Sequence, residues 1–166
     1  MFNKTILITF LSLFMTIVTV NSQAADPLTI TKQKTIDVPP STLWALLGDF
    51  NGFNRWHPAV IGSELISGDG QSNGSKRILT LGDGAEIKET LLDYNSSNMS
   101  YTYKITESPL PISDYVSTIK VEKNAKGTST VTWTANFNSA GAEDAKAVEI
   151  MSGVYDGGLN ALDNLY

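Results

Sequence analysis

The chain has 166 residues, with 12 Lys and Arg against 17 Asp and Glu, and a formal net charge of −5 at pH 7. Nucleic-acid binding needs a concentrated excess of Lys and Arg to displace counterions from phosphates, so this composition argues against nucleic acid as a partner. The absence of cysteine and the presence of one histidine exclude disulfides, thiolate metal sites, cysteine nucleophiles and histidine clusters. We therefore expect no metal and no cofactor.

The first residues have the pattern of a secretory signal peptide. Lys4 lies in a short n-region, and the run 6–20 is apolar apart from Thr and Ser. An uncleaved membrane anchor is the alternative, but a spanning helix requires about 20 apolar residues, and this run is marginally too short. The pattern therefore favours a segment that is removed.

Small residues indicate the point of cleavage. A cut after Ala24 places Ser22 and Ala24 at the two positions that signal peptidase reads. We expect residues 1–24 to be a signal peptide and residues 25–166 to form one domain. The mature protein is then periplasmic or secreted, with no membrane attachment.

The start of the mature chain predicts one strand and two short helices. Alternating apolar and polar residues at 28–38 are typical of a half-buried strand, which two prolines end. Apolar residues at helical spacing then predict a helix at 41–50, with Ser41 as its N-cap. A second short helix is expected at 53–57, ended by Pro58.

Six further strands are expected, each separated from the next by a cluster of turn residues. No segment between them is long enough for a parallel crossover helix, so they predict consecutive antiparallel hairpins. The expected strands are 60–66, 76–81, 85–94, 99–106, 113–123 and 128–138.

Two of the hairpins have a register that the sequence specifies. Aligning the last two strands to place apolar residues on one face is possible in a single register, because a slip of one residue exchanges the faces. A tight turn centred on Asp83 likewise places opposite charges across from each other. The expected pairs are Tyr115 with Phe137, Ser117 with Ala135, Ile119 with Trp133, Val121 with Val131, Arg77 with Glu89, Leu79 with Ile87, and Leu81 with Ala85.

The segment 142–166 predicts a long amphipathic helix. Glycines at 153, 157 and 158 weaken it, so we expect them where the helix bends or approaches another part of the chain closely. Its expected apolar stripe is Ala145, Val148, Met151, Tyr155, Leu159, Leu162 and Tyr166.

This order of elements, together with several short motifs, resembles the START/Bet v 1-like (SRPBCC) superfamily, in its bacterial polyketide cyclase/dehydrase-like branch. The resemblance implies an α+β helix-grip fold, in which a seven-stranded curved antiparallel sheet wraps around a long C-terminal helix, with two short helices after the first strand. The matching motifs are Trp44 to Phe50, Arg55 to Pro58, Arg77, the turn Gly82 to Gly84, Glu89 to Asp93, Tyr101 to Tyr103, Ser108 to Pro111, Gly127 to Trp133, and Gly158 with Leu159.

The resemblance also implies a cavity between the sheet and the final helix that binds apolar small molecules or lipids. Its members include enzymes and many non-enzymes, because a fold is shared more widely than a chemistry. The first hypothesis is therefore a non-catalytic carrier or sensor that binds a hydrophobic ligand. The alternatives are a cyclase or dehydratase that uses the same cavity, and an accessory protein that docks a periplasmic partner such as an oxidation system.

Candidate ligand contacts lie on the expected inner faces of the sheet and the final helix. Arg77 and Glu89 either anchor a ligand carboxylate or carbonyl or form a structural cross-strand ion pair. Tyr101 and Tyr103 share a face that we expect to point inward, because large exposed apolar patches are unusual. The full set is Arg77, Glu89, Tyr101, Tyr103, Tyr115, Ile119, Trp133, Phe137, Met151 and Tyr155.

If the cavity is an active site, Glu89, Tyr103 and His57 are the candidates for acid/base catalysis. Burial in an apolar pocket shifts the pKa of a carboxyl group toward neutrality. His57 has no identified carboxylate to orient it, which favours a structural role for this side chain.

Two loops are expected at the mouth of the cavity. In an antiparallel meander alternate turns lie at the same end, and in the superfamily the corresponding loops act as gate and latch. The resemblance implies that role here for Gly82, Asp83, Gly84, Pro109, Leu110 and Pro111. Glycine permits the backbone to move, while the two prolines stiffen the facing loop.

Overall fold

The computed structural model describes residues 26–166, so the expected signal peptide at 1–24 lies outside the described residues. The elements follow the predicted order of one strand, two short helices, six strands and a long helix. They are β1 (Leu28–Ile36), α1 (Pro40–Leu47), the 3₁₀ helix η1 (Phe50–Arg55), β2 (Val60–Ser67), β3 (Lys76–Leu81), β4 (Glu86–Asn95), β5 (Ser100–Glu107), β6 (Ile112–Lys123), β7 (Ser129–Ser139) and α2 (Asp144–Leu165).

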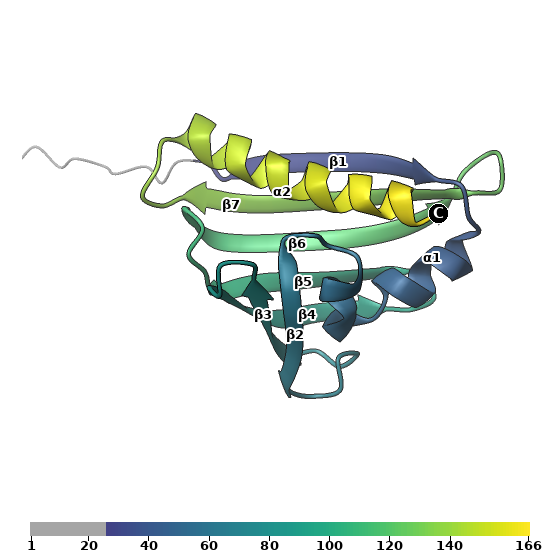
Figure 1. Cartoon of the computed structure of the whole chain (residues 1–166), viewed down its shortest axis with the longest axis horizontal. Coiled ribbons are helices and arrows are strands. Elements are labelled where there is room, and N and C mark those ends of the chain that lie inside the picture. Colours follow the sequence, from purple (N-terminus) through teal and green to yellow (C-terminus); the bar gives the residue numbers. More distant parts are fainter. Residues whose placement is uncertain (1–25) are drawn as a thin grey trace, which may run out of the picture.

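The seven strands form one antiparallel sheet in the order β1-β7-β6-β5-β4-β3-β2. The first strand therefore pairs with the last one, and β2 forms the other edge. Figure 1 shows α2 lying along β1 and β7. The 3₁₀ helix η1 contacts β2 and β3, and α1 contacts η1, β6 and β7. This is the α+β helix-grip fold that the sequence resembles.

The predicted register of the β6–β7 hairpin is confirmed over most of its length, including Ile119 opposite Trp133. It is interrupted near the start of β6, where Asp114 has a positive φ of 52° and the pairing shifts. The expected direct pairing of Tyr115 with Phe137 is therefore replaced by a β-bulge, in which one strand has an extra residue. Both rings still point inward, with centroids 6.3 Å apart.

The β3–β4 hairpin has the predicted register. Arg77 lies opposite Glu89, and the amide of Leu81 donates a hydrogen bond of 2.8 Å to the carbonyl of Ala85. Gly84 closes the turn with a φ of 86°, a conformation that glycine adopts without a steric penalty.

The two short helices begin earlier than predicted. The helix α1 starts at Pro40, because the fixed φ of proline suits the first helical position, so Ser41 lies inside the helix and is not its N-cap. The second helix is a 3₁₀ helix that starts at Phe50. The Asp49 side chain caps it by accepting a hydrogen bond of 3.0 Å from the amide of Asn51.

The buried face of α2 differs from the predicted stripe at its two ends. Ala147 is buried in place of Ala145, and Tyr166 is exposed. The middle of the stripe is buried as predicted. Gly158 faces the His57 ring so closely that a Cβ atom added to it would lie 2.6 Å from the ring carbon Cδ2.

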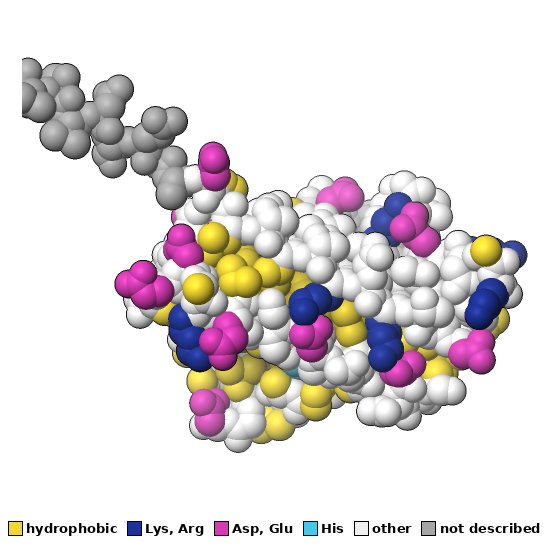
Figure 2. Space-filling model, turned by 90° about the horizontal axis from the view of Figure 1, so that it is seen from above, with side chains coloured by type: hydrophobic (Ala, Val, Ile, Leu, Met, Phe, Trp, Pro, Cys, Tyr) yellow, Lys and Arg dark blue, Asp and Glu magenta, His cyan; other side chains and the backbone are white. Residues whose placement is uncertain are grey.

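The surface of the described chain is polar and mixed in charge. Figure 2 shows positive and negative side chains interspersed over one face, with hydrophobic side chains gathered toward one end. Ion pairs of 2.9 Å between Lys32 and Asp156 and of 2.8 Å between Lys34 and Asp163 connect β1 to α2. Within residues 26–166, no helix has both the length and the apolar character needed to cross a bilayer.

Candidate ligand-binding cavity

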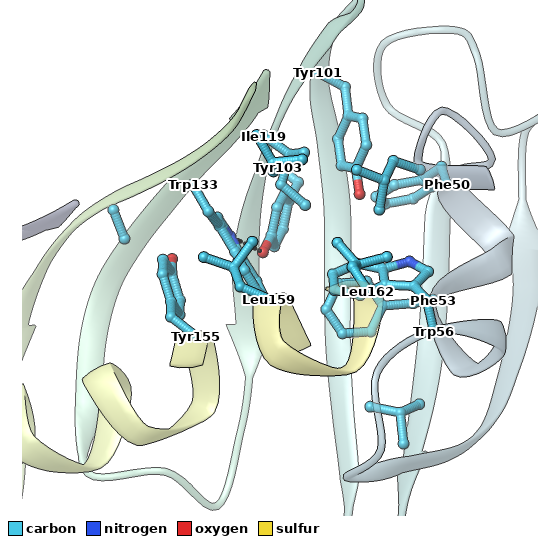
Figure 3. Packing of buried hydrophobic residues seen from close by; sticks show 14 of the residues in the cluster. Phe50, Phe53, Trp56, Tyr101, Tyr103, Ile119, Trp133, Tyr155, Leu159 and Leu162 are labelled. Carbon is cyan, nitrogen blue, oxygen red and sulfur yellow. Dashed lines mark hydrogen bonds between the residues drawn. The ribbon is translucent and has the colours of Figure 1, made fainter. Parts of the chain in front are cut away.

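A cavity of about 160 Å³ lies between the sheet, the η1 region and α2. Figure 3 shows the surrounding core, in which aromatic side chains of the sheet, of η1 and of α2 point toward one another. The lining residues are Phe53, His57, Ala59, Val60, Leu79, Leu81, Ile87, Glu89, Tyr103, Ile105, Leu110, Tyr115, Trp133, Met151 and Val154.

The wall of this cavity is almost entirely apolar because of strand periodicity. Leu79 and Leu81 alternate along β3, and Ile87 and Glu89 alternate along β4, so each pair faces the same side of the sheet. Glu89 is thus the carboxylate that the β4 pattern places among hydrophobic neighbours. An apolar cavity with few polar groups is the usual form of a small-molecule site.

Glu89 is held by Arg77 in a buried ion pair. The guanidinium contacts Oε2 of Glu89 through Nε and Nη2, each at 2.6 Å, and Nη1 donates to the carbonyl of Phe50. Burial raises the pKa of the Glu89 carboxyl, and the guanidinium opposes that increase. For Arg77, burial lowers the pKa, but the attraction of Glu89, Tyr101 and Tyr103 together with the hydrogen bond to Glu89 outweighs it and holds the pKa above its ordinary value.

Aromatic rings enclose the guanidinium of Arg77. Its central carbon lies 4.0 Å from the centroid of the Phe50 ring, 4.8 Å from that of Phe53 and 5.5 Å from that of Tyr103. Cation–π attraction of this kind favours the charged form of the side chain. Arg77 itself does not line the cavity, so Glu89 is the member of the ion pair that does.

A network of hydroxyl groups surrounds Ser117, beneath the aromatic part of the wall. The indole Nε1 of Trp133 donates to Ser117 at 2.9 Å and to the hydroxyl of Tyr103 at 3.2 Å. The hydroxyl of Tyr155 lies 2.9 Å from Ser117 and 2.5 Å from the hydroxyl of Tyr115. Buried polar groups that are paired in this way stabilise one arrangement of the core.

The three tyrosines of this network are neutral phenols. Burial raises the pKa of Tyr103, Tyr115 and Tyr155 well above the ordinary value. Burial also raises the pKa of Tyr101 to about 12. None of these groups is therefore suited to act as a base near neutral pH.

His57 is fixed by backbone groups on both sides of its ring. Nδ1 accepts a hydrogen bond of 3.3 Å from the amide of Ala59, so Nε2 carries the proton and donates to the carbonyl of Val154 at 3.0 Å. Burial lowers the pKa of the imidazole, and the Val154 carbonyl opposes that decrease. Nε2 thus joins the segment after η1 to α2, Nδ1 is engaged by the local backbone, and both ring nitrogens are occupied.

A second hollow, of about 640 Å³, lies where β5 and β6 separate. The paired residues of these strands end at Lys104 and Val116, although β5 continues to Glu107. The bulge in β6 lies at the same place. Ile105 and Tyr115 line both this hollow and the apolar cavity, so the two spaces are adjacent.

The fold and its cavity can be compared with known proteins. The model of the family described as polyketide cyclase / dehydrase and lipid transport matches residues 27–166. The chain belongs to this family. The match covers nearly all of the described residues and confirms the resemblance that the sequence motifs carry.

Solved structures support the same assignment to the family. The protein XoxI from Bacillus cereus is 32% identical, with 83% of this chain and 94% of that chain covered and a TM-score of 0.78. A protein of Bacillus thuringiensis is 32% identical, covering 83% and 98% with a TM-score of 0.77, and one of Thermobifida fusca is 30% identical, covering 81% and 90% with a TM-score of 0.70. The comparison with curated proteins finds no match.

Half of the side chains that the family resemblance suggested as ligand contacts line the cavity. Those that line it are Glu89, Tyr103, Tyr115, Trp133 and Met151. The others are buried around it without lining it, and they are Arg77, Tyr101, Ile119, Phe137 and Tyr155. Tyr155 supports the wall directly, because its ring stacks on Trp133 at a centroid distance of 3.9 Å.

The two loops expected at the mouth lie at one end of the sheet, as predicted. Lys88 pairs with Glu107, which brings the start of β4 beside the end of β5. The carbonyl of Pro111 accepts a hydrogen bond of 3.0 Å from the amide of Ala140 in the β7–α2 connection. Leu110 lines the cavity, whereas Pro109, Pro111 and the turn Gly82, Asp83 and Gly84 do not.

Sequence reasoning missed several lining residues. Phe53 was assigned to a short helix without a ligand role, and Leu79 and Ile87 were used only to set the register of the hairpin. The register already places both residues on the face of Glu89, so the signal was present. No sequence signal indicated Val154, because this residue lies outside the predicted apolar stripe of α2.

The described residues provide no cluster of three or more His, Asp or Glu side chains arranged to hold a metal ion.

Proposed function

We propose that this protein binds a small, largely hydrophobic molecule in the cavity between the sheet and α2. The observation that supports this proposal is a cavity of about 160 Å³ whose wall is apolar except for Glu89 and the polar ends of His57 and the two lining tyrosines. An apolar cavity of roughly 150 Å³ accepts a ligand of the size of benzene. The family description, which includes lipid transport, points to the same class of ligand.

We also propose that the protein is exported and acts in the periplasm or outside the cell. The basis is the signal-peptide pattern of residues 1–24, which lie outside the described residues.

A cavity-filling variant tests the binding function. Ile87→Phe adds volume at the cavity wall and leaves less space for a ligand. We therefore expect the dissociation constant of toluene to rise by at least about tenfold, which corresponds to about 1.4 kcal/mol. Ile61→Phe is the matched control, because Ile61 is 65% exposed on β2 and does not line the cavity. Calorimetric titration of both folded variants gives the answer. Equal binding of toluene by both variants, or no binding by the unsubstituted protein, would contradict the proposal.

A cyclase or dehydratase is the second candidate, and the observation that favours it is Glu89. Burial raises the pKa of this carboxyl group at the wall of an apolar cavity, and groups with such an environment serve as acids or bases in enzymes. The ion pair with Arg77 opposes that use, because it stabilises the carboxylate. Native mass spectrometry of protein purified from its host separates the two functions: an unchanged co-purified molecule supports binding, whereas its conversion during incubation supports catalysis.

A further inference from the structure

The wall of the cavity offers one carboxylate oxygen that the protein does not use. Both contacts of Glu89 with Arg77 go to Oε2. Among the described residues, no hydrogen bond is made to Oε1, although Glu89 is only 4% exposed. Glu89 lines the cavity and Arg77 does not. Because Oε2 is held by Arg77, which does not line the cavity, Oε1 is the oxygen of this lining residue that is available to a ligand.

The ion pair with Arg77 favours the ionised form of Glu89, which accepts hydrogen bonds, and opposes the effect of burial, which raises the pKa of this carboxyl group. The guanidinium of Arg77 is fully buried, contacts Oε2 twice and lies over the faces of two phenylalanine rings. A guanidinium does not lose its proton in proteins, and it favours the ionised form of a carboxyl group beside it. An ionised carboxylate can only accept.

This arrangement reverses the ligand chemistry that the sequence suggested. A free Arg77 would attract a ligand carboxylate or carbonyl. In the structure, however, Nε of Arg77 donates to Glu89 and Nη1 donates to the carbonyl of Phe50. Nη2 is buried and lies 2.6 Å from Oε2 of Glu89, without a hydrogen bond within residues 26–166. The member of this pair that lines the cavity is negative, so it repels a ligand carboxylate.

We propose that the ligand is a compact, neutral, ring-sized molecule that donates a hydrogen bond to Oε1 of Glu89 through a hydroxyl group, as a phenol does. The rest of the ligand contacts apolar side chains such as Leu79, Ile87 and Val154. This inference rests on the proposed function, and it names the polar group by which that function selects its ligand.

Phenol and toluene form a matched pair of probes, because they differ by a hydroxyl in place of a methyl group. The quantity to compare is the ratio of the dissociation constant of toluene to that of phenol, in the unsubstituted protein and in Arg77→Met/Glu89→Leu. The hydration of the free ligands cancels in this comparison. The double variant replaces a buried ion pair with apolar residues of similar size, a change that proteins tolerate when both partners are replaced.

We expect the ratio to fall by at least about tenfold in the double variant, which corresponds to about 1.4 kcal/mol, because the hydrogen bond from phenol to a charged group is lost. Lys88→Met/Glu107→Leu is the control. It removes an ion pair of 2.6 Å between β4 and β5 that is exposed, and it should leave the ratio unchanged. A ratio that is the same in all three proteins would overturn the inference while leaving the binding function intact.

The unsubstituted protein gives a second test that does not depend on the folding of a variant. Benzoate carries a carboxylate, and fluorobenzene carries an acceptor without a donor. We expect benzoate not to bind and fluorobenzene to bind like toluene. Binding of benzoate as tight as that of phenol would overturn the inference. Failure of phenol, toluene and fluorobenzene alike would instead contradict the proposed function.

Discussion

The imidazole of His57 is held between the backbone of Ala59 and that of Val154 in α2, so its pKa depends on how α2 packs against the segment after η1. Burial lowers its pKa below the ordinary value of 6.5, and the hydrogen bond to Val154 opposes that decrease. His57 is the one histidine in the chain, so its NMR signal needs no assignment among several. We expect a titration midpoint below 6.5. A midpoint at or above 6.5 would show that the ring is accessible.

The same shift predicts how stability depends on pH. Because the folded-state pKa is lower than the unfolded one, the unfolded chain takes up the proton first as the pH falls below about 6.5. The contribution of His57 to stability is therefore complete above that pH and is lost between the unfolded and folded pKa. We expect His57→Asn to show a smaller decrease in the free energy of unfolding between about pH 7.5 and about pH 5 than the unsubstituted protein does.

Gly158 allows α2 to approach the end of η1. A Cβ atom there would lie 2.6 Å from Cδ2 of His57 and 3.0 Å from the Trp56 ring. Gly158→Ala should therefore lower the free energy of unfolding by about 1–3 kcal/mol, the usual cost of overpacking a core. Urea denaturation measures this change.

Gly157→Ala is the control for that substitution, because the same Cβ atom would meet nothing within 4 Å. Alanine is favoured over glycine inside a helix by about 1 kcal/mol, so this neighbouring variant should be stabilised. Similar effects of both substitutions would indicate that helix propensity, and not contact with His57, decides the outcome at position 158.

At the scale of elements, the β6–β7 hairpin contributes the centre of the core. Trp133 is buried on β7, stacks on Tyr155 of α2 and donates to Ser117 of β6. Trp133→Ala should cost about 3–5 kcal/mol, as is usual for removing a large buried aromatic side chain. Thr132→Ala, on the opposite face of the same strand, should change stability by less than about 1 kcal/mol. Thermal or urea unfolding distinguishes them, and a small effect at Trp133 would contradict the observed packing.

The gating role of the β3–β4 turn stays a prediction that exchange kinetics can test. Gly84→Ala strains a turn whose φ is 86° and reduces the motion of that loop, so we expect slower exchange of bound 4-fluorotoluene in fluorine NMR. Gly127→Ala introduces the same strain at a φ of 87° in the β6–β7 turn, at the other end of the sheet, and should leave exchange unchanged. Equal rates in both variants would favour entry through the hollow between β5 and β6.

At the scale of the whole molecule, α2 is held against the sheet by the burial of its apolar side chains and not by charges on the surface. The ion pairs that join β1 to α2 involve Lys32 and Lys34, both partly exposed, and exposed pairs contribute about 0–1 kcal/mol each. The buried side of α2 contributes Met151, Tyr155 and Leu159 to the core. Because the cavity lies within this core, a ligand can occupy it while α2 and the sheet stay packed against each other.

Export predicts a shortened mature chain. The proposed cut after Ala24 removes the apolar segment and leaves Ala25 as the first residue. N-terminal sequencing of protein recovered from the periplasmic fraction of its host should begin at Ala25. Recovery of an intact Met1 in the membrane fraction would contradict both the cleavage and the proposed location.

The sequence by itself determined the order of the elements, the antiparallel sheet and most of its register. These features follow from local rules: the alternation of apolar residues on β3, β4, β6 and β7, the turn residues between them, and the change to helical spacing before α2. Its errors were also local. Ser41 lies within α1 because Pro40 begins that helix, and the bulge at Asp114 was missed because a single residue at positive φ leaves no periodic signal.

Only the tertiary structure decided the chemistry of the cavity. Sequence placed Arg77 and Glu89 opposite each other, but which of the two faces the cavity depends on Phe50 and Phe53 of η1, which enclose the guanidinium. The fold likewise decides the hydrogen bonds of His57. Nε2 donates to the carbonyl of Val154, which is distant in sequence, and Nδ1 accepts from the amide of Ala59, which the backbone conformation brings close. Contacts of this kind depend on how separate elements pack, and no local pattern in the chain records them.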